Sequence, residues 1–324
     1  MSRKEIEFRP GFPPISIDVI DVESIACHWH EALEVVWVLS GEIYLKESNM
    51  PYNLKPGDVY VVNYNETHKI SAVNGRATVV FLHFDFHYFT KYIPNLHEIS
   101  YEHYCFSNNL DVNESLVECH EYIKELYPLL EQEKPDKGLI MRIEPLAHSF
   151  IQHLIDTFQY TFYKKSGDTY RAAIDKSANL SQDQLRRLHR LTHYIYMNSN
   201  NKLTLDDVAE SVFYSKFYVS HFIKKAYGLS FQETLCLSRV TISERLLIGT
   251  DFTMDNIAAM TGFSTRNQYC QQFKKWHGIT PSRYRKENSP NNPDNTDLVF
   301  PSDYESAKRK MLFADNVKPE NADL

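Results

Sequence analysis

The chain has 324 residues, of which 43% are hydrophobic and 24% are charged. This length and composition bury substantial cores and predict about two domains, which excludes one small module. The five cysteines form no C-x-x-C pair, which indicates free thiols in a reducing compartment. No apolar run approaches the roughly 20 residues of a membrane span, and Met1 to Arg9 is charged rather than signal-like. We therefore expect a cytoplasmic protein without a membrane partner.

The net charge of −7 argues, for the chain as a whole, against a nucleic-acid partner. The charge is unevenly distributed, however. Residues 1–180 carry 16 Lys and Arg against 26 Asp and Glu, residues 181–287 carry 15 against 9, and residues 288–324 carry 4 against 7. A basic block between two acidic segments indicates two domains with different partners, the basic one facing phosphate, although ordinary surface variation also produces such counts.

The first part of the acidic segment, from Ile15 to about Phe86, has the pattern of short strands. Runs rich in Val, Ile and aromatic residues are separated by Gly, Pro and Asn. The runs are Ile15–Ile20, Leu33–Leu39, Ile43–Lys46, Val59–Asn63 and Thr78–Phe84. Strands at this spacing predict a small antiparallel barrel or jelly roll.

The motif His28-Trp29-His30-Glu31-Ala32-Leu33-Glu34, followed by Pro56-Gly57-Asp58 and His68, resembles a cupin barrel. In metal-binding cupins the positions matching His28, His30, Glu34 and His68 are ligands, and such donors suit Fe, Mn, Zn or Ni. Three roles stay open for them: lining an effector pocket, closing hydrogen bonds at the barrel mouth, or holding a catalytic metal. We expect no cofactor and no metal, and an effector site, with a sugar as one candidate ligand. The candidate effector-binding residues are His28, His30, Glu34, Tyr44, Tyr60, His68 and His83.

Two amphipathic helices are predicted after the barrel, at about Asn113 to Gln132 and Lys137 to Tyr163. One apolar stripe is available to pair with a second subunit in a homodimer, and the alternative is that both helices pack on their own barrel. Residues 166–181 are polar and are the expected linker. Residues 288–324 are rich in Pro and Asn, and we expect them to be a mobile extension.

The basic block contains an internal repeat. Thr204-Leu205-Asp206-Asp207-Val208-Ala209 recurs 49 residues later as Thr253-Met254-Asp255-Asn256-Ile257-Ala258. Each copy begins with a Thr N-cap and acidic residues, continues as a helix with one apolar stripe, and turns at a serine, Ser215 or Ser264, that can cap a second helix. Each second helix ends at a glycine, Gly228 or Gly278. The repeat predicts two helix-turn-helix units joined by a helix from about Phe231 to Ile248.

The faces left free by the apolar stripes are candidates for DNA recognition. Arg, Asn and Gln suit base edges, whereas Lys and Ser also contact phosphates; the alternative is a solvated polar face. The connecting helix is long enough to place the two units near one turn of DNA apart, about 34 Å. The candidate DNA-binding residues are Ser215, Lys216, Phe217, Ser220, His221, Lys224, Lys225, Thr265, Arg266, Asn267, Cys270, Gln271, Lys274 and Lys275.

Residues 186–286 resemble the DNA-binding domain of AraC/XylS-family transcription regulators. The motifs that carry the resemblance are Leu205-x-x-Val208-Ala209, Ser215 through Lys225, Arg239, Ile257-Ala258-x-x-x-Gly262-Phe263-Ser264, Tyr269-x-x-x-Phe273-Lys274-Lys275, and Gly278 with Thr280-Pro281-Ser282-Arg283-Tyr284-Arg285. The sequence departs from the family at three positions. Ile223 replaces a Phe, Ser243 replaces a small apolar residue, and His221 stands where a basic residue reads DNA, which leaves the base preference of the first unit open.

The expected fold is α+β and multidomain, with a cupin-like antiparallel β-barrel and flanking helices followed by an all-α double helix-turn-helix domain. The expected boundaries are residues 1–165 for effector binding and dimerisation, 166–181 for the linker, 182–287 for DNA binding and 288–324 for the extension. The resemblance implies a promoter-binding regulator under effector control, more often an activator, which would then contact RNA polymerase. The alternatives are a cupin metalloenzyme fused to a DNA-binding module and a regulator without a small-molecule ligand.

Overall fold

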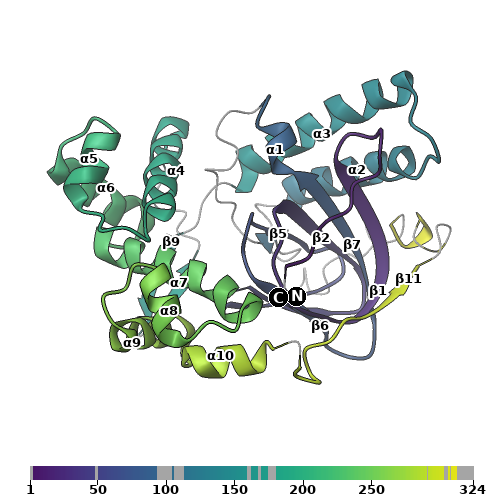
Figure 1. The fold of residues 1–324 in the computed structure, drawn as a ribbon. Helices are drawn as coiled ribbons and strands as arrows, with labels where there is room; N and C mark the ends of the chain where they lie inside the picture. The colour runs from purple at the N-terminus through teal and green to yellow at the C-terminus, as the bar shows by residue number, and fades with distance from the viewer. Residues whose placement is uncertain are drawn as a thin grey trace, which may run out of the picture.

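The computed structural model describes residues 3–47, 50–92, 104–105, 113–158, 162–166, 169–173, 180–289, 291–302, 306 and 308–311. An antiparallel β-barrel formed by the N-terminal residues lies beside a helical domain formed by residues 180–289 (Figure 1). This arrangement confirms the expected fold class. No helix within the described ranges is long and apolar enough to cross a membrane.

The barrel sheet has nine strands in the order β4-β3-β6-β1-β7-β2-β5-β8, with β11 paired to β1. The five predicted strands are present, and β1 extends eight residues beyond the predicted end at Ile20. The strands are β1 (Ile15–His28), β2 (Ala32–Ser40), β3 (Ile43–Glu47), β4 (Met50–Leu54), β5 (Val59–Val62), β6 (His68–Ala72), β7 (Ala77–Asp85), β8 (Tyr104–Cys105) and β11 (Leu298–Pro301). Strands β4, β6, β8 and β11 were not predicted.

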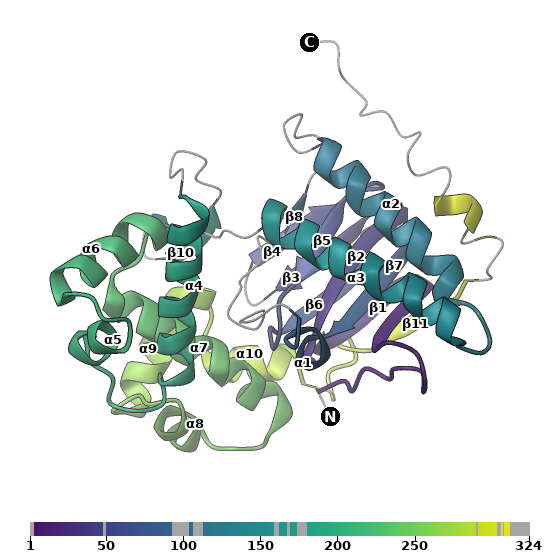
Figure 2. The same ribbon diagram turned by 90° about the horizontal axis from the view of Figure 1, so that it is seen from above.

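The barrel strands β2 and β7 are buried on both faces, which explains their continuous apolar runs. Alternate residues of β2, such as Val36 and Val38, fill the barrel interior. The intervening residues, such as Val35, face the helices α2 (Asn113–Leu130) and α3 (Lys137–Phe158), which cover this side of the barrel (Figure 2). The short helix α1 (Phe86–Phe89) follows β7.

The apolar stripes of α2 and α3 are buried against the chain's own barrel. Leu116, Ile123, Phe150 and Leu154 belong to the same core cluster as the outer face of β2 and β7. Of the two alternatives, packing on the own barrel is therefore the one observed, and these stripes do not support a helical dimer contact. At the start of the expected linker, β9 (Phe162–Ser166) and β10 (Thr169–Ala173) pair as a hairpin.

The helical domain contains both predicted helix-turn-helix units. Its helices are α4 (Gln182–Met197), α5 (Leu205–Ser211), α6 (Lys216–Tyr227), α7 (Phe231–Gly249), α8 (Met254–Met260), α9 (Arg266–His277) and α10 (Pro281–Glu287). Thr204, Ser215 and Thr253 cap their helices as predicted. The cap of α9 is Thr265 and not Ser264, because the second copy has one extra residue in the turn.

The two units have separate cores, one around Val208 and Phe222 and the other around Ile257 and Phe273. Helix α7 contributes to both, with Leu235 in the first and Leu247 in the second. Both predicted glycine caps have the left-handed backbone, with φ of 78° at Gly228 and 72° at Gly278.

The C-terminal extension differs from expectation where the structure describes it. Leu298–Pro301 form β11, which pairs antiparallel with β1 from Ile20 to Ser24. Met311 is buried in the core cluster that α2 and α3 form with the barrel. Within the described part of the extension, residues 298–301 thus pair with the barrel sheet and Met311 packs in its core.

Gly262 is the glycine whose replacement we expect to destabilise the helical domain most clearly. Its φ is +82°, and a Cβ atom would lie 2.7 Å from Ser199 O and 2.9 Å from Asn200 O. We expect Gly262→Ala to lower the free energy of unfolding by roughly 1–3 kcal/mol, measured by urea denaturation. Gly249→Ala is the control, because no heavy atom lies within 4 Å of the place that its new Cβ would occupy and its φ is ordinary. Equal stability of the two variants would contradict this account.

Candidate functional site: a histidine–glutamate cluster beside two recognition helices

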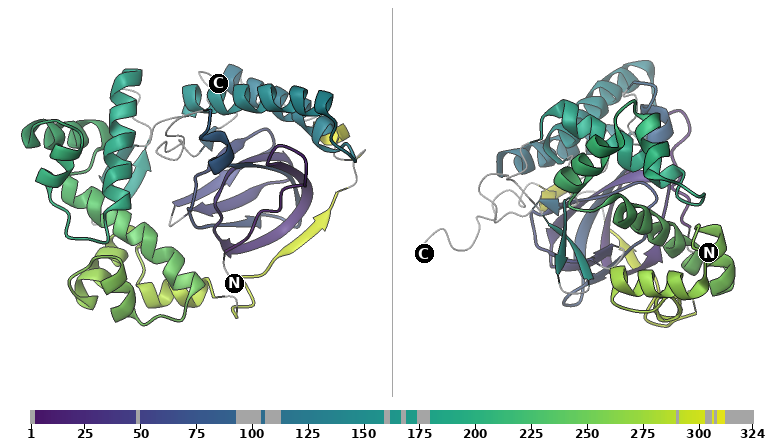
Figure 3. Two further views of the ribbon diagram at one scale, coloured as in Figure 1. Left: turned by 45° about the horizontal axis from the view of Figure 1, so that its top comes forward. Right: turned by 90° about the vertical axis from the view of Figure 1, so that its left-hand side faces the viewer.

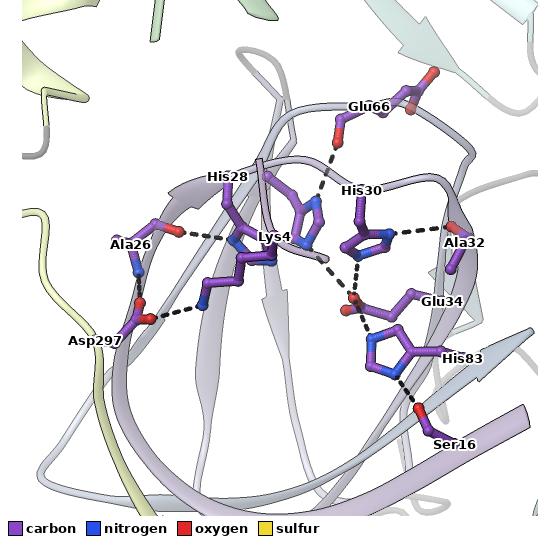
Figure 4. A network of polar contacts seen from close by, with 11 residues as sticks. Lys4, Ser16, Ala26, His28, His30, Ala32, Glu34, Glu66, His83 and Asp297 are labelled. Atoms are coloured by element: carbon purple, nitrogen blue, oxygen red, sulfur yellow. Dashed lines mark hydrogen bonds and ion pairs between the residues drawn. The ribbon is translucent and has the colours of Figure 1, made fainter. Parts of the chain in front are cut away.

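Four of the predicted site residues meet at one end of the barrel interior. His28 ends β1, His30 lies in the connection to β2, Glu34 is in β2, and His68 begins β6. All four are buried, and one ligand-type atom from each lies within 4.8 Å of those of the others. Figure 4 shows the labelled His28, His30 and Glu34 approaching one another from these elements.

The hydrogen bonds of the imidazoles fix which nitrogen faces the cluster. Nδ1 lies 2.8 Å from Ala26 O in His28, 3.2 Å from Ala32 O in His30 and 3.1 Å from the backbone O of residue 66 in His68. A carbonyl oxygen only accepts, so Nδ1 is the donor in His28 and His68. Both nitrogens of His30 face acceptors, and the closer one is Glu34 Oε2, 2.7 Å from Nε2. Burial lowers the pKa of His30 to about 4 and lowers that of His28 well below its usual value, which keeps both neutral. The Nε2 atoms of His28, His30 and His68 therefore face the cluster.

Glu34 is the carboxylate that these nitrogens surround. Its Oε2 lies 2.7 Å from His30 Nε2, 3.1 Å from His83 Nε2 and 3.5 Å from His68 Nε2. Burial by itself raises the pKa of Glu34, but the His68 charge and contacts with the three imidazoles hold the carboxyl pKa well below its usual range. The site thus keeps an ionised carboxylate in an apolar surrounding, which is costly without a compensating cation.

The donor set fits a transition-metal ion. Among the described residues, Glu34 Oε1 and His68 Nε2 have no hydrogen-bond partner. Nδ1 anchored on a carbonyl, with Nε2 directed inward, is the usual arrangement of metal-binding histidines. Two ligand atoms that each lie about 2.1 Å from one ion are at most about 4.2 Å apart, so atoms separated by 4.8 Å would have to approach each other by about 0.6 Å or more on binding. His28, His30, Glu34 and His68 are the residues that would hold the ion.

The three remaining predicted effector residues lie in different places: one at the cluster, one elsewhere inside the barrel and one on its outer surface. His83 reaches the cluster, but its Nδ1 contacts Ser16 Oγ at 3.2 Å and its Nε2 can donate to Glu34, so it supports the carboxylate. Tyr60 is inside the barrel and donates to Glu47. Tyr44 is 44% exposed, because Ile43 and Leu45 on either side point inward and alternation directs Tyr44 outward. The structure therefore does not bring Tyr44 to the site.

Helix α6 presents its predicted DNA-binding residues to solvent. Val219, Phe222, Ile223 and Ala226 are buried, and the opposite face is free. Phe217 is 83% exposed and stacks at 6.5 Å on His221. The exposed predicted residues of this unit are Ser215, Lys216, Phe217, Ser220, His221, Lys224 and Lys225.

Helix α9 presents an equivalent but more polar face. Tyr269, Phe273, Trp276 and His277 are buried on its inner side. Lys275 and Cys270 are partly buried. The exposed predicted residues are Thr265, Arg266, Asn267, Gln271 and Lys274. Amide and guanidinium groups on one free helix face match the hydrogen-bonding groups of base edges.

The helical domain contacts the barrel next to the cluster, a relation that the sequence did not reveal. Glu244 of α7 is 1% exposed and accepts a hydrogen bond from Thr67, the residue before His68. Its Oε1 lies 3.0 Å from His277 Nε2. Tyr284 OH lies 3.1 Å from Thr67 Oγ1 and 3.4 Å from Glu244 Oε2. A buried carboxylate in a helix is the signal that could have indicated such a contact.

A second contact lies beside His28. Cys27 is buried in the core of the second helix-turn-helix unit, and burial raises its thiol pKa to about 12. Trp29 packs on the same core, with the Arg245 guanidinium 5.2 Å from its ring. The residues flanking the cluster therefore contact the DNA-binding domain directly.

The fold and site define a class of two-domain proteins in which a cupin-type barrel precedes a helix-turn-helix domain. Residues 19–85 match the family model described as a cupin domain, and residues 208–287 match one described as a helix-turn-helix domain. The chain thus combines a cupin domain with a helix-turn-helix domain.

Similar proteins include the regulatory protein PocR of Salmonella typhimurium, 30% identical over 105 residues, which are 32% of this chain and 35% of PocR. An uncharacterised HTH-type transcriptional regulator of Staphylococcus aureus (strain MRSA252) is 20% identical over 78% of this chain and 31% of its own length. This chain thus spans about a third of each of these relatives. Among solved structures, ToxT from Vibrio cholerae aligns with 84% of this chain and 97% of its own, at 12% identity and a TM-score of 0.43.

The buried Glu47 predicts a pH-dependent stability. Burial raises its pKa to about 7, so the folded state binds the proton more tightly than the unfolded state does. Its contribution is complete below pH about 4.5 and is lost as the pH rises through about 7, by up to roughly 3 kcal/mol. Glu47→Gln should remove this loss. The buried His28, His30 and His120 act in the opposite direction as the pH falls below about 6.5, so the measured quantity is the difference between wild type and variant in urea denaturation at pH 5 and pH 8. A constant difference would contradict the assignment.

Proposed function

We propose that this protein is a sequence-specific DNA-binding transcription regulator controlled by an effector at the barrel cluster. The observation that carries the proposal is the pair of exposed faces on α6 and α9, each held by a buried stripe and flanked by lysines. Helix α7 has 19 residues and a length of about 28 Å, which suits two units that enter successive major grooves about 34 Å apart. Activation, which would involve RNA polymerase, and homodimer formation remain predictions.

The two recognition helices should contribute differently to specificity. Helix α9 carries Arg266, Asn267 and Gln271, which can make paired hydrogen bonds to guanine or adenine. Helix α6 carries Phe217 and His221 in the equivalent region and has fewer groups for such bonds. Lys224, Lys225 and Lys274 are placed for phosphates. We infer that α9 supplies most of the polar base readout and that α6 adds phosphate and apolar contacts.

Substitutions in α9 test the DNA interface. Gln271→Ala should reduce discrimination at one base pair, costing about 1–3 kcal/mol there, because it removes a base-edge contact. Lys274→Ala should weaken binding to all sequences and reduce the slope of log K against log salt by about one. Both are measured by fluorescence anisotropy with operator variants selected by the protein from random DNA. If both variants bound every sequence like the wild type, the assignment of α9 would be wrong.

We further propose that the effector site contains a transition-metal ion, which differs from the expectation of no metal. The proposal is supported by the inward-facing Nε2 atoms of His28, His30 and His68 and by the ionised, buried Glu34. A bound ion would supply a Lewis-acidic anchor for an oxygen-bearing effector. We infer a regulatory and not a catalytic role, because the cluster lies against the DNA-binding domain through Thr67 and Cys27. The metalloenzyme alternative predicts turnover by the loaded protein; a sugar remains one candidate effector.

Cobalt titration tests the metal proposal. Co²⁺ should bind the wild type at one equivalent with visible absorption bands, and Glu34→Gln or His68→Ala should weaken binding by at least about tenfold because each removes a ligand. His87→Ala is the control for adventitious binding, since His87 is exposed and lies outside the cluster. Absence of bands in the wild type, or equal binding by Glu34→Gln, would contradict the proposal.

A further inference from the structure

After α10 the chain returns to the barrel as a strap, which we define as residues 293–301. Figure 1 and Figure 3 show this segment leaving the helical domain and running along the barrel as β11. The backbone pairs of β11 with β1 are Pro301 with Ile20, Phe300 with Asp21, Val299 with Val22 and Leu298 with Ser24. The DNA-binding domain is thus joined to the barrel by chain at both of its ends.

The strap is fixed to the barrel along its length. The Arg76 guanidinium lies 3.6 Å from the centre of the Phe300 ring. Asp297 accepts a hydrogen bond from Ala26 N at 2.7 Å and pairs with Lys4 Nζ at 2.7 Å. Beyond the strap, Lys310 Nζ donates to Thr78 Oγ1 at 2.7 Å. The strap is therefore a part of the barrel although it follows the DNA-binding domain in the chain.

One side chain of the strap bonds both domains. Asn295 is 4% exposed, and its Oδ1 accepts a hydrogen bond from Cys27 N at 2.8 Å. Its Nδ2 donates to Asn288 O at 2.9 Å and to Ser289 O at 3.2 Å, where α10 ends. Because these are buried backbone groups, losing their partner leaves them unsatisfied.

Two contacts join the barrel to the helical domain, one through Asn295 and one between Thr67 and Glu244, and we call them the joints. They lie on either side of the histidine–glutamate cluster. Asn295 binds the backbone of Cys27, next to His28, and Ala26 O receives the Nδ1 proton of His28. Thr67, next to His68, binds Glu244 of α7. A change in the separation of His28 and His68 therefore moves residues that the DNA-binding domain contacts directly.

The joints involve only one of the two helix-turn-helix units. Among the described residues, the core of the second unit includes Cys27 of the barrel, whereas the core of the first unit includes no barrel residue. The second unit carries α9, and the first is connected to the barrel surface through α7.

We propose that the strap makes the second helix-turn-helix unit a rigid continuation of the barrel end, with Asn295 as the bond that couples occupancy of the cluster to the position of α9. This inference rests on the proposed function for ligand binding at the cluster and for DNA binding by α9. The hydrogen bonds of Asn295 that join the two domains do not involve the ligand. Binding at the cluster would contract it, and the joints would transmit that movement directly to the unit that carries α9, whereas α6 is connected to the joints through α7.

The joint is tested by a matched pair of substitutions in the full-length chain. Asn295→Asp keeps the acceptor for Cys27 N but replaces the donor to Asn288 O and Ser289 O with an oxygen. Asn292→Asp makes the same change at a donor to Glu287 O, within the helical domain. Calorimetry should show one unfolding transition for wild type and Asn292→Asp, and two for Asn295→Asp. With Co²⁺ as the probe, the wild-type transition should shift as a whole, whereas in Asn295→Asp only the barrel transition should shift.

The outcomes separate this inference from the proposed function. Two independent transitions in the wild type, or one transition in Asn295→Asp, would overturn the joint. If Asn295→Asp splits the transition but Co²⁺ shifts neither protein, the joint stands and the metal proposal fails. Asn295→Ala, which adds no charge, replaces Asn295→Asp if that variant does not fold, and it should also split the transition.

Discussion

The ionised carboxylate of Glu34, enclosed at the end of the barrel, is the constraint on which the site and its surroundings depend. A carboxylate without water needs cationic or donor partners, and the Nε2 atoms of three imidazoles, His30, His68 and His83, lie within 3.5 Å of Glu34 Oε2. His28, His30 and His68 are oriented by backbone carbonyls of Ala26, Ala32 and residue 66, so the backbone at the barrel end is also fixed. The DNA-binding domain contacts the residues next to these carbonyls. The backbone groups that orient the imidazoles around Glu34 therefore lie next to the residues on which the second domain rests.

The contact between the domains has the physical character of a core and not of a flexible interface. Glu244 is buried with Thr67, Tyr284 and His277, and Cys27 and Trp29 complete an apolar cluster formed by α7, α9 and α10. A buried polar group of this kind is worth little when satisfied and costs a few kcal/mol when it loses its partner. Small displacements at this interface are therefore resisted, and larger ones require a second arrangement. Such an interface favours switching between discrete states over gradual bending.

Local patterns in the sequence predicted the helical domain well, because each helix carries its own cap, stripe and stop. Thr204, Ser215, Thr253, Gly228 and Gly278 have the predicted roles, and only the cap of α9 was assigned one residue too early. The barrel was predicted where apolar runs are continuous. Strands β4 and β6 were missed because Pro51 interrupts one and Ile70 is the main apolar residue of the other. Tyr44 was misplaced although alternation with Ile43 and Leu45 directs it outward. The strap could not be predicted, because β11 is short and its partner β1 lies more than 270 residues away.

The asymmetry between the two helix-turn-helix units gives the coupling a direction. Any ligand that favours one arrangement of the barrel end changes the affinity for DNA by the same factor by which DNA changes the affinity for that ligand. A factor of 5–150, the usual range, corresponds to about 1–3 kcal/mol, which a few buried hydrogen bonds at the joints can supply. The unit that carries α9 contacts the barrel directly, whereas the unit that carries α6 does so through α7. A ligand at the barrel end should therefore change the spacing and angle between two successive major-groove contacts. Effector control would then change which DNA spacing the protein accepts, as well as how tightly it binds.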